Sequence, residues 1–276
     1  MMVNAFDVLK DRGFFQQCTD EKTLREAFGK ESICAYVGFD PTGDSLHVGH
    51  LFPLMALINL ERLGHKPIVL LGGGTAMIGD PSGKSEMRQM LTREEVDSNI
   101  ESFQAVIGRL LDFKGGQSLL VDNSDWILDL NYIQFLRDVG KHFSVNRMLS
   151  AEAYKMRLEK GLSFIEFNYQ ILQAYDFMEL NKRYGCTLQM GGDDQWGNIL
   201  AGVDLTRRLN QSLVFGLTFP LQLTATGEKM GKTSTGAIWL EPEKLKPYDY
   251  YQYWVNVHDD DIERLLGLFT FLPMCE

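Results

Sequence analysis

Cysteine is scarce in this chain, and its copies lie far apart. The 276 residues include Cys18, Cys34, Cys186 and Cys275, with neither a Cys-x-x-C pair nor a histidine cluster beside any of them. This spacing argues against a structural zinc site and against a disulfide framework. We therefore expect a cytoplasmic protein without a dedicated metal site.

Long hydrophobic runs are missing as well. No apolar stretch approaches the roughly 20 residues that cross a bilayer, and residues 1–15 lack the basic-then-apolar order of a signal peptide. Acidic residues outnumber basic ones, so the net charge is −10. Such a charge disfavours nonspecific coating of nucleic acid, although a local basic patch can still bind it. We expect no membrane association.

Strand and helix patterns alternate along most of the chain. Short apolar runs at 32–39, 67–74, 118–123, 186–192 and 214–223 are typical of buried strands. Helical periodicity is present at 92–111, 131–143, 163–185 and 198–209, and after an expected N-cap at Asp44 or Ser45. This alternation predicts an α/β fold built on a doubly wound parallel sheet.

Three polar, glycine-rich loops follow predicted strands. They read GFDPTGDSLHVGHL (38–51), GGGTAMIGDPSGK (72–84) and GGDDQW (191–196). Any one of them could be a simple turn. The carboxyl ends of parallel strands share one edge of a sheet, where ligands bind. The three loops together therefore predict a binding site.

His47 and His50 lie three residues apart at the start of a predicted helix. At this spacing both side chains face the same way, beside helix N–H groups that can bind an anion. Gly49 between them would let a ligand approach the backbone. The pair could also be two solvated histidines on a capped helix, and without a third ligand nearby it is a weak zinc motif.

A second basic stretch, GEKMGKTSTGAIWL, covers residues 227–240. Two lysines three residues apart on a flexible loop can close over a polyphosphate and stabilise its developing charge. The same residues could also form an ordinary solvated loop that binds no ligand.

HVGH and KMGKT together resemble the two signature motifs of the class I aminoacyl-tRNA synthetases. YVGFDPTGDSLHVGH, IGDPSGK, NYQILQAYDF and GGDDQWGNI are similar, in order and spacing, to the bacterial tyrosyl-tRNA synthetases. The resemblance covers essentially the whole chain. It implies a Rossmann-like catalytic domain over residues 1–225, with a helical insertion around 125–185. Residues 226–276 would form a mobile, lysine-rich loop and the start of a helical domain, without the family's C-terminal tRNA-binding domain.

The same resemblance implies a tyrosine–tRNA ligase. Such an enzyme activates L-tyrosine with ATP, releasing pyrophosphate, and then transfers the tyrosyl group to tRNA(Tyr). Mg²⁺ would arrive with ATP, and the second step would be impaired in a chain that lacks the tRNA-binding domain. A homodimer is also implied, and we expect Phe135, Leu136 and Phe143 to be available for its interface.

The resemblance assigns three groups of site residues. The catalytic group is Thr42, His47, His50, Lys229, Lys232 and Thr233. The ATP-binding group is Gly38, Asp40, Gly49, Lys84, Arg88, Gly192 and Asp194. The tyrosine-binding group is Tyr36, Asp80, Tyr169, Gln173, Asp176 and Gln195. In that last group, Tyr36 and Asp176 would bind the phenol, while Asp80, Tyr169 and Gln173 would hold the amino group.

Three other functions stay open from the sequence. The chain could be a nucleotidyltransferase of another pathway, since H-x-G-H also binds nucleotides there. It could be an RNA-binding relative without catalysis, or a synthetase for another amino acid. The pair Tyr36 and Asp176 favours tyrosine, because buried polar groups left unpaired reject a substrate that lacks the hydroxyl.

Overall fold

A six-stranded sheet forms the centre of the computed structural model, which describes residues 3–82, 90–151, 154, 158–225, 227, 230–233 and 236–274. The strands are β1 (Gln17–Cys18), β2 (Cys34–Phe39), β3 (Lys66–Leu71), β4 (Leu119–Asp122), β5 (Leu188–Gly192) and β6 (Phe215–Phe219). Their order is β1-β6-β5-β2-β3-β4. All neighbours from β6 to β4 are parallel, which confirms the predicted sheet. The antiparallel edge strand β1 was not predicted, because two residues carry no periodicity.

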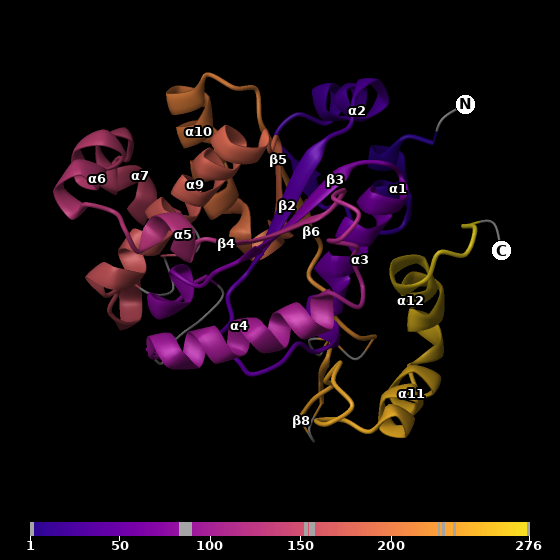
Figure 1. Cartoon of the computed structure of the whole chain (residues 1–276). Coiled ribbons are helices and arrows are strands. Elements are labelled where there is room, and N and C mark those ends of the chain that lie inside the picture. Colours follow the sequence, from indigo (N-terminus) through magenta and orange to yellow (C-terminus); the bar gives the residue numbers. More distant parts are fainter. Residues whose placement is uncertain are drawn as a thin grey trace.

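Helices cover both faces of the sheet (Figure 1). One face is covered by α1 (Ala5–Asp11), α2 (Glu21–Lys30), α3 (Val48–Arg62) and α4 (Arg93–Ile107). The other carries α5 (Ser124–Ile127), α9 (Phe164–Tyr184) and α10 (Trp196–Asn210). Ala35 and Val37 of β2 join the first core, while Cys34 and Tyr36 join the second. A central parallel strand is buried on both faces in this way.

The chain between β4 and β5 is helical, and α6 (Tyr132–Asp138) and α7 (Val145–Leu149) project from the sheet in Figure 1. The predicted helix at 131–143 is α6 followed by a separate 3₁₀ turn, η2 (Gly140–His142). The long helix α9 has the predicted bounds. Its N-terminus is a capping box of Ser163 and Glu166, and Gly185 ends it at φ +66°.

The segment after β6 ends beside α1 and α3. It contains β7 (Lys232–Thr233), β8 (Gly236–Ala237), α11 (Pro247–Val255), η4 (Asp259–Asp261) and α12 (Ile262–Phe269). Arg12, at the end of α1, donates to the carbonyls of Gly267, Thr270 and Leu272 over 2.7–3.0 Å. Among the described residues, no helix is both long and apolar enough to cross a membrane.

Candidate active site

A cavity of about 440 Å³ opens at the carboxyl ends of β2, β3 and β5. Every predicted site residue whose side chain is described lines it: Tyr36, Gly38, Asp40, Thr42, His47, Gly49, His50, Asp80, Tyr169, Gln173, Asp176, Gly192, Asp194 and Gln195. Lys84, Arg88 and Lys229 lie outside the described residues, and Lys232 and Thr233 are described by their backbone alone. The three glycine-rich loops therefore meet at one edge, as predicted.

His47 and His50 cap helix α3 reciprocally. The Gly49 N–H donates to His47 Nδ1 over 3.0 Å, and the His47 N–H donates to His50 Nδ1 over 3.1 Å. The N-cap is thus His47, and the predictions of Asp44 and Ser45 were wrong. Because both Nδ1 atoms accept hydrogen bonds, each neutral imidazole carries its proton on Nε2.

The backbone amides of this helix end have partners within the protein. The Val48 N–H donates to the Ile238 carbonyl over 2.9 Å, and the His50 N–H to the His47 carbonyl over 2.8 Å. The expectation of unpaired N–H groups for an anion was therefore wrong. The donors that this turn offers to a phosphate are the imidazole Nε2–H groups.

Gly49 makes room for protein atoms. A Cβ there would lie 2.7 Å from the His47 ring and 3.5 Å from the Met230 carbonyl oxygen. Gly231, at φ +83°, approaches from the other side, and its own Cβ would lie 2.7 Å from the Gly49 nitrogen. The backbone of the K-M-G-K-T segment therefore packs directly on the histidine turn, and a side chain at either glycine would separate them.

Asp40 ends β2 and is tied to two neighbouring elements. Its carboxylate accepts 2.7 Å hydrogen bonds from the Thr75 hydroxyl, in η1 (Thr75–Met77), and from the Tyr169 hydroxyl of α9. Burial and the nearby carboxylate of Asp40 raise the pKa of Tyr169 well above its usual value, so this phenol keeps its proton. Asp40 thereby fixes the distance between the sheet edge and α9.

Asp176 is buried at the inner end of the cavity, beside Tyr36. Its carboxyl accepts hydrogen bonds from Trp126 Nε1 (2.8 Å) and Asn123 Nδ2 (3.0 Å). The Tyr36 hydroxyl is buried and, among the described residues, has no hydrogen-bond partner. Burial, with Asp176 nearby, raises the Tyr36 pKa well above its usual value. A buried hydroxyl without a partner is costly, and a ligand hydroxyl entering this end of the cavity would remove that cost.

A second polar network lies nearer the mouth. Asp80 accepts from the Ser82 N–H (2.9 Å) and from Gln195 Nε2 (2.8 Å). Asn198 Nδ2 lies 3.0–3.2 Å from three acceptors, which belong to Ser82, Gln173 and Gln195. Asn198 thus holds α9, α10 and the loop after β3 in one arrangement.

Burial raises the pKa of Asp80 to about 6 and that of Asp176 to about 8, well above the usual range of an aspartate. Between about pH 4 and its own pKa in the folded chain, each carboxyl therefore takes up a proton on folding. Over that range the free energy of unfolding falls as the pH rises. We expect the wild-type chain to lose stability relative to Asp176→Asn between pH 4 and 8, with a constant difference above that. Chemical denaturation over this range measures it, and parallel curves would contradict the protonation of Asp176.

The outer half of the cavity has room for a larger ligand. A Cβ on Gly38 would meet no atom within 4 Å, so this strand position opens into the cavity. A Cβ on Gly192 would lie 2.6 Å from an oxygen of Asp194. Gly192 therefore makes room first for the Asp194 carboxylate, whose side chain is exposed at the rim.

Comparisons with known proteins agree with this geometry. The family model described as tRNA synthetases class I (W and Y) matches residues 29–276. A tyrosine–tRNA ligase of Clostridium botulinum strain 657 is 55% identical over 275 residues, which is all of this chain and 68% of that relative. This chain belongs to the tyrosine–tRNA ligase family.

Solved structures support the assignment. A C-terminally truncated mitochondrial tyrosyl-tRNA synthetase of Aspergillus nidulans superposes with a TM-score of 0.86 at 31% identity, covering 99% of this chain and 81% of that one. A tyrosyl-tRNA synthetase of Archaeoglobus fulgidus has the same fold, with a TM-score of 0.74 at 20% identity over 97% and 81% of the two chains. The Rossmann-like class I fold implied by the sequence motifs is confirmed.

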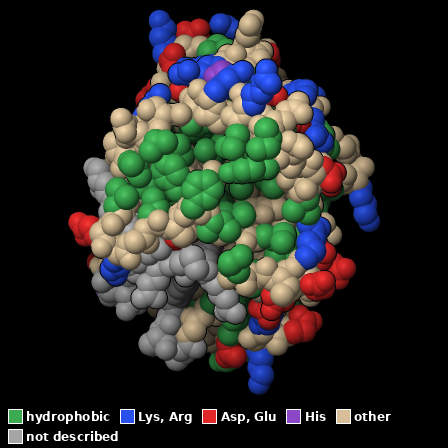
Figure 2. All heavy atoms as spheres, turned by 90° about the vertical axis from the view of Figure 1, so that its left-hand side faces the viewer, with side chains coloured by type: hydrophobic (Ala, Val, Ile, Leu, Met, Phe, Trp, Pro, Cys, Tyr) green, Lys and Arg blue, Asp and Glu red, His purple; other side chains and the backbone are tan. Residues whose placement is uncertain are grey.

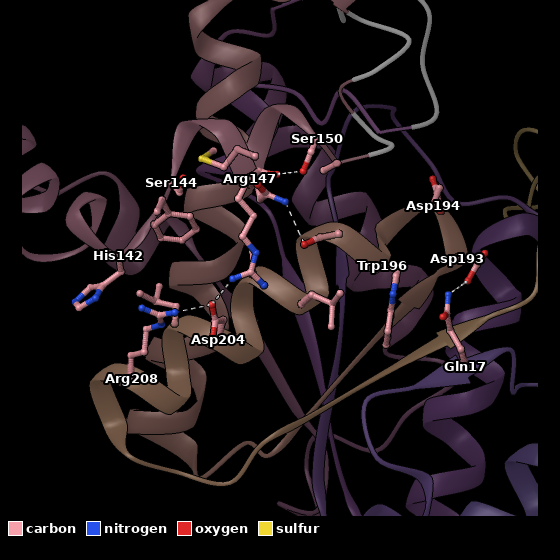
Figure 3. Close-up of a pocket in the computed structure, with 18 residues that line it drawn as sticks. Gln17, His142, Ser144, Arg147, Ser150, Asp193, Asp194, Trp196, Asp204 and Arg208 are labelled. Atoms are coloured by element: carbon pink, nitrogen blue, oxygen red, sulfur yellow. Dashed lines mark hydrogen bonds and ion pairs between the residues drawn. The ribbon is translucent and has the colours of Figure 1, made fainter.

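A second cavity, of about 590 Å³, adjoins the first in this synthetase (Figure 3). The two share Asp193 and Asp194 at their common rim. Arg147 of α7 and Arg208 of α10 point into it, and both pair with Asp204 over 3.0–3.1 Å. The indole ring of Trp196 lies beside the shared rim.

Several site residues were missed from the sequence. Asn123 and Trp126 reach Asp176 from about 50 positions away, and nothing local marks them. Asn198 could have been found, because it lies one helical turn after Gln195. In the described part of the chain, no group of three or more His, Cys, Asp or Glu side chains is placed to hold a metal ion.

Proposed function

We propose that this chain joins L-tyrosine to tRNA(Tyr) through a tyrosyl-adenylate formed from tyrosine and ATP, with release of pyrophosphate. The observation that carries the proposal is one cavity with two chemically distinct ends. Its inner end has the unpartnered Tyr36 hydroxyl beside Asp176, and its outer end has the paired imidazoles of His47 and His50.

Tyrosine would lie along α9. Its phenol would enter between Tyr36 and Asp176, and either protonation state of Asp176 can hydrogen-bond a phenol. Its ammonium group would lie against Asp80, Gln173 and Tyr169, where the network centred on Asn198 keeps the acceptors in place. Because an ammonium favours the ionised carboxyl, we expect bound tyrosine to lower the pKa of Asp80.

ATP would then occupy the outer half of the cavity, along Gly38, Gly192 and Asp194. The tyrosine carboxylate attacks the α-phosphorus, the bond to the bridging oxygen breaks, and pyrophosphate leaves with that electron pair. Donors aimed at the leaving group stabilise this charge most when they are already in place. The Nε2–H groups of His47 and His50 would supply such donors, together with Thr42, Lys229, Lys232 and Thr233.

Mg²⁺ would be held by the ATP phosphates themselves. The carboxylate oxygens of Asp40 already accept hydrogen bonds from Thr75 and Tyr169, and one oxygen of Asp193 accepts from Gln17 and Thr218. When bound, the ion neutralises charge on the polyphosphate. Lys84 and Arg88 would assist from the loop after β3.

The tRNA acceptor end would reach the adenylate through the second cavity. Arg147 and Arg208 can contact phosphates there, and the Trp196 indole can stack on a base near the shared rim. Arg207 contributes less, because its guanidinium donates to the Val214 carbonyl of its own chain. The expected patch at Lys155 and Arg157 lies outside the described residues. We also propose a cytoplasmic location, as expected from the sequence.

Tyrosine-dependent exchange of labelled pyrophosphate into ATP tests the proposal directly. We expect exchange with tyrosine and almost none with tryptophan or phenylalanine. Exchange with tryptophan would indicate a synthetase for another amino acid. Exchange without any amino acid would indicate a nucleotidyltransferase, and no exchange, with intact tRNA binding, would indicate a relative that has lost catalysis.

We also propose that the chain forms a homodimer through the face shown in Figure 2. Apolar side chains gather there, on the side where α6 and α7 lie in Figure 1. The exposed large apolar side chains of the described residues between 128 and 164 are Leu128, Tyr132, Ile133, Leu136, Val145, Leu158 and Phe164. Of the three residues expected from the sequence, Leu136 is exposed, whereas Phe135 and Phe143 are partly buried and pack against a core cluster of their own chain. An exposed apolar patch that is gathered on one face is typical of a subunit interface.

Ile133→Asp should convert the dimer into monomers at micromolar concentration. Ile133 is 70% exposed in the single chain, so a carboxylate there costs the monomer little, whereas burying it in an apolar interface is expensive. Sedimentation velocity measures the outcome. Val3→Asp, at a residue 67% exposed outside this face, is the matched control. A wild-type monomer, or an unchanged dimer in Ile133→Asp, would contradict this interface.

A further inference from the structure

The segment that follows the K-M-G-K-T motif lies antiparallel to the residues around His47. The Val48 N–H donates to the Ile238 carbonyl and the Leu240 N–H to the Leu46 carbonyl, each over 2.9 Å. These two bonds flank a bridge that sets His47 directly opposite Trp239. The backbone pairing alone therefore places the Cα atom of Trp239 opposite His47.

The Trp239 ring contacts the His47 imidazole edge-on. The ring centroids are 6.1 Å apart and the planes meet at 65°. The centroid of the His50 ring lies 4.1 Å from that of the same imidazole. The Gly49 N–H donates a hydrogen bond to Nδ1 of His47. His50 and Gly49 belong to the histidine motif itself, whereas Trp239 belongs to the segment after the lysine-bearing loop.

Lys244 makes a second contact with the Trp239 ring. Its Nζ lies 5.4 Å from the ring centroid, within the range of a cation–π contact, and pairs with the Asp44 carboxylate. Asp44 lies three residues before His47 in the same loop. Residues 238–244 thus contact residues 44–48 through two side-chain contacts and two backbone hydrogen bonds.

We propose that Trp239 is a positioning residue that sets the orientation of the His47 imidazole for adenylate formation. This inference rests on the proposed function. The capping bond fixes the position of Nδ1, and the contact with the indole ring adds a restraint on the plane of the imidazole. Since the Nε2–H must point at the leaving pyrophosphate, a small misorientation lowers the rate of the chemical step and leaves substrate affinity alone.

Trp239→Leu tests the proposal, because leucine keeps apolar bulk and the backbone bridge but has no ring edge. We expect the rate of adenylate formation at saturating ATP and tyrosine to fall about 10-fold, with both dissociation constants within about twofold of wild type. Trp239→Phe, which restores an aromatic edge, should recover most of the rate. Loss of tyrosine binding in parallel with the rate would indicate a merely structural role and overturn the proposal.

A double-mutant cycle with His47→Asn makes the test specific. If Trp239 acts through His47, Trp239→Leu should have no further effect once the imidazole is gone. A further 10-fold loss in the double variant would overturn the proposal. A second readout needs no activity: the imidazole resonances of His47 should shift in Trp239→Leu and return in Trp239→Phe. Unchanged resonances would also overturn it, whereas absent exchange activity in the wild type would count against the proposed function instead.

Discussion

His47→Asn should slow tyrosyl-adenylate formation by about 10²–10³ while leaving the fold intact. Asparagine is among the best N-cap residues, so its side-chain oxygen can replace His47 Nδ1 as the acceptor at the start of α3. Its shorter side chain has no donor at the position of Nε2. Losing one preorganised donor to a developing anion costs about 2.7–4 kcal/mol of barrier. Single-turnover kinetics with saturating tyrosine and ATP measure the rate.

His47→Ala separates the two roles of this residue. Alanine removes both the donor and the cap, so it should lower the free energy of unfolding by about 0.5–2 kcal/mol in addition to slowing the reaction. Urea denaturation of both variants provides the comparison. Equal stability losses in the two variants would show that asparagine does not replace the cap. An unchanged rate in His47→Asn would remove this imidazole from the chemistry.

Asp176→Asn should lower the preference for tyrosine over phenylalanine by a factor of at least about 10². Sites built to hydrogen-bond a substrate hydroxyl reject the analogue without it by about 10⁴–10⁵, and tyrosyl-tRNA synthetases are themselves the known example. Trp126 and Asn123 donate to different oxygens of Asp176. An amide has one oxygen, so its NH₂ group must face one of these donors. That conflict holds for either protonation state of the native carboxyl and displaces the group that contacts the phenol.

The measurement is kcat/KM for pyrophosphate exchange with each amino acid. Asp204→Asn is a matched control, because Asp204 also accepts from two side chains but lies in the second cavity. It should keep the full selectivity. Thermal unfolding of both variants checks that they fold. Undiminished selectivity in a folded Asp176→Asn variant would show that the phenol is bound elsewhere.

The sheet was predictable because its parallel strands are buried on both faces. Such strands read as short apolar runs, and the loops after them contain the glycines and polar residues of a ligand site. The ends of elements were less accessible. Ser163 and Thr92 are of residue types that commonly cap helices, whereas His47 is an unusual cap, and no pattern predicts that an imidazole will cap its own helix.

The site was predictable where one helix or one loop holds the residues. The family resemblance assigned Tyr169, Gln173 and Asp176 to the site, and their helical spacing on α9 places them on one face. The groups behind them could not be predicted, because Asn123 and Trp126 meet Asp176 only after β4 has paired with β3. The same limit applies to Trp239, whose contact with His47 depends on the return of the chain after β8.

The placement of the helices between β4 and β5 separates the two substrates in the chain. Three of the six groups proposed to contact tyrosine, Tyr169, Gln173 and Asp176, lie on α9, whereas those proposed to contact ATP lie at or beyond the carboxyl ends of strands. Asp176 serves the phenol end alone, whereas Tyr169 also donates to Asp40 on the side proposed for ATP. The scaffold is therefore modular at its inner end, where amino-acid specificity can change through Asp176 and the groups that hold it while the loops proposed to hold the nucleotide stay the same.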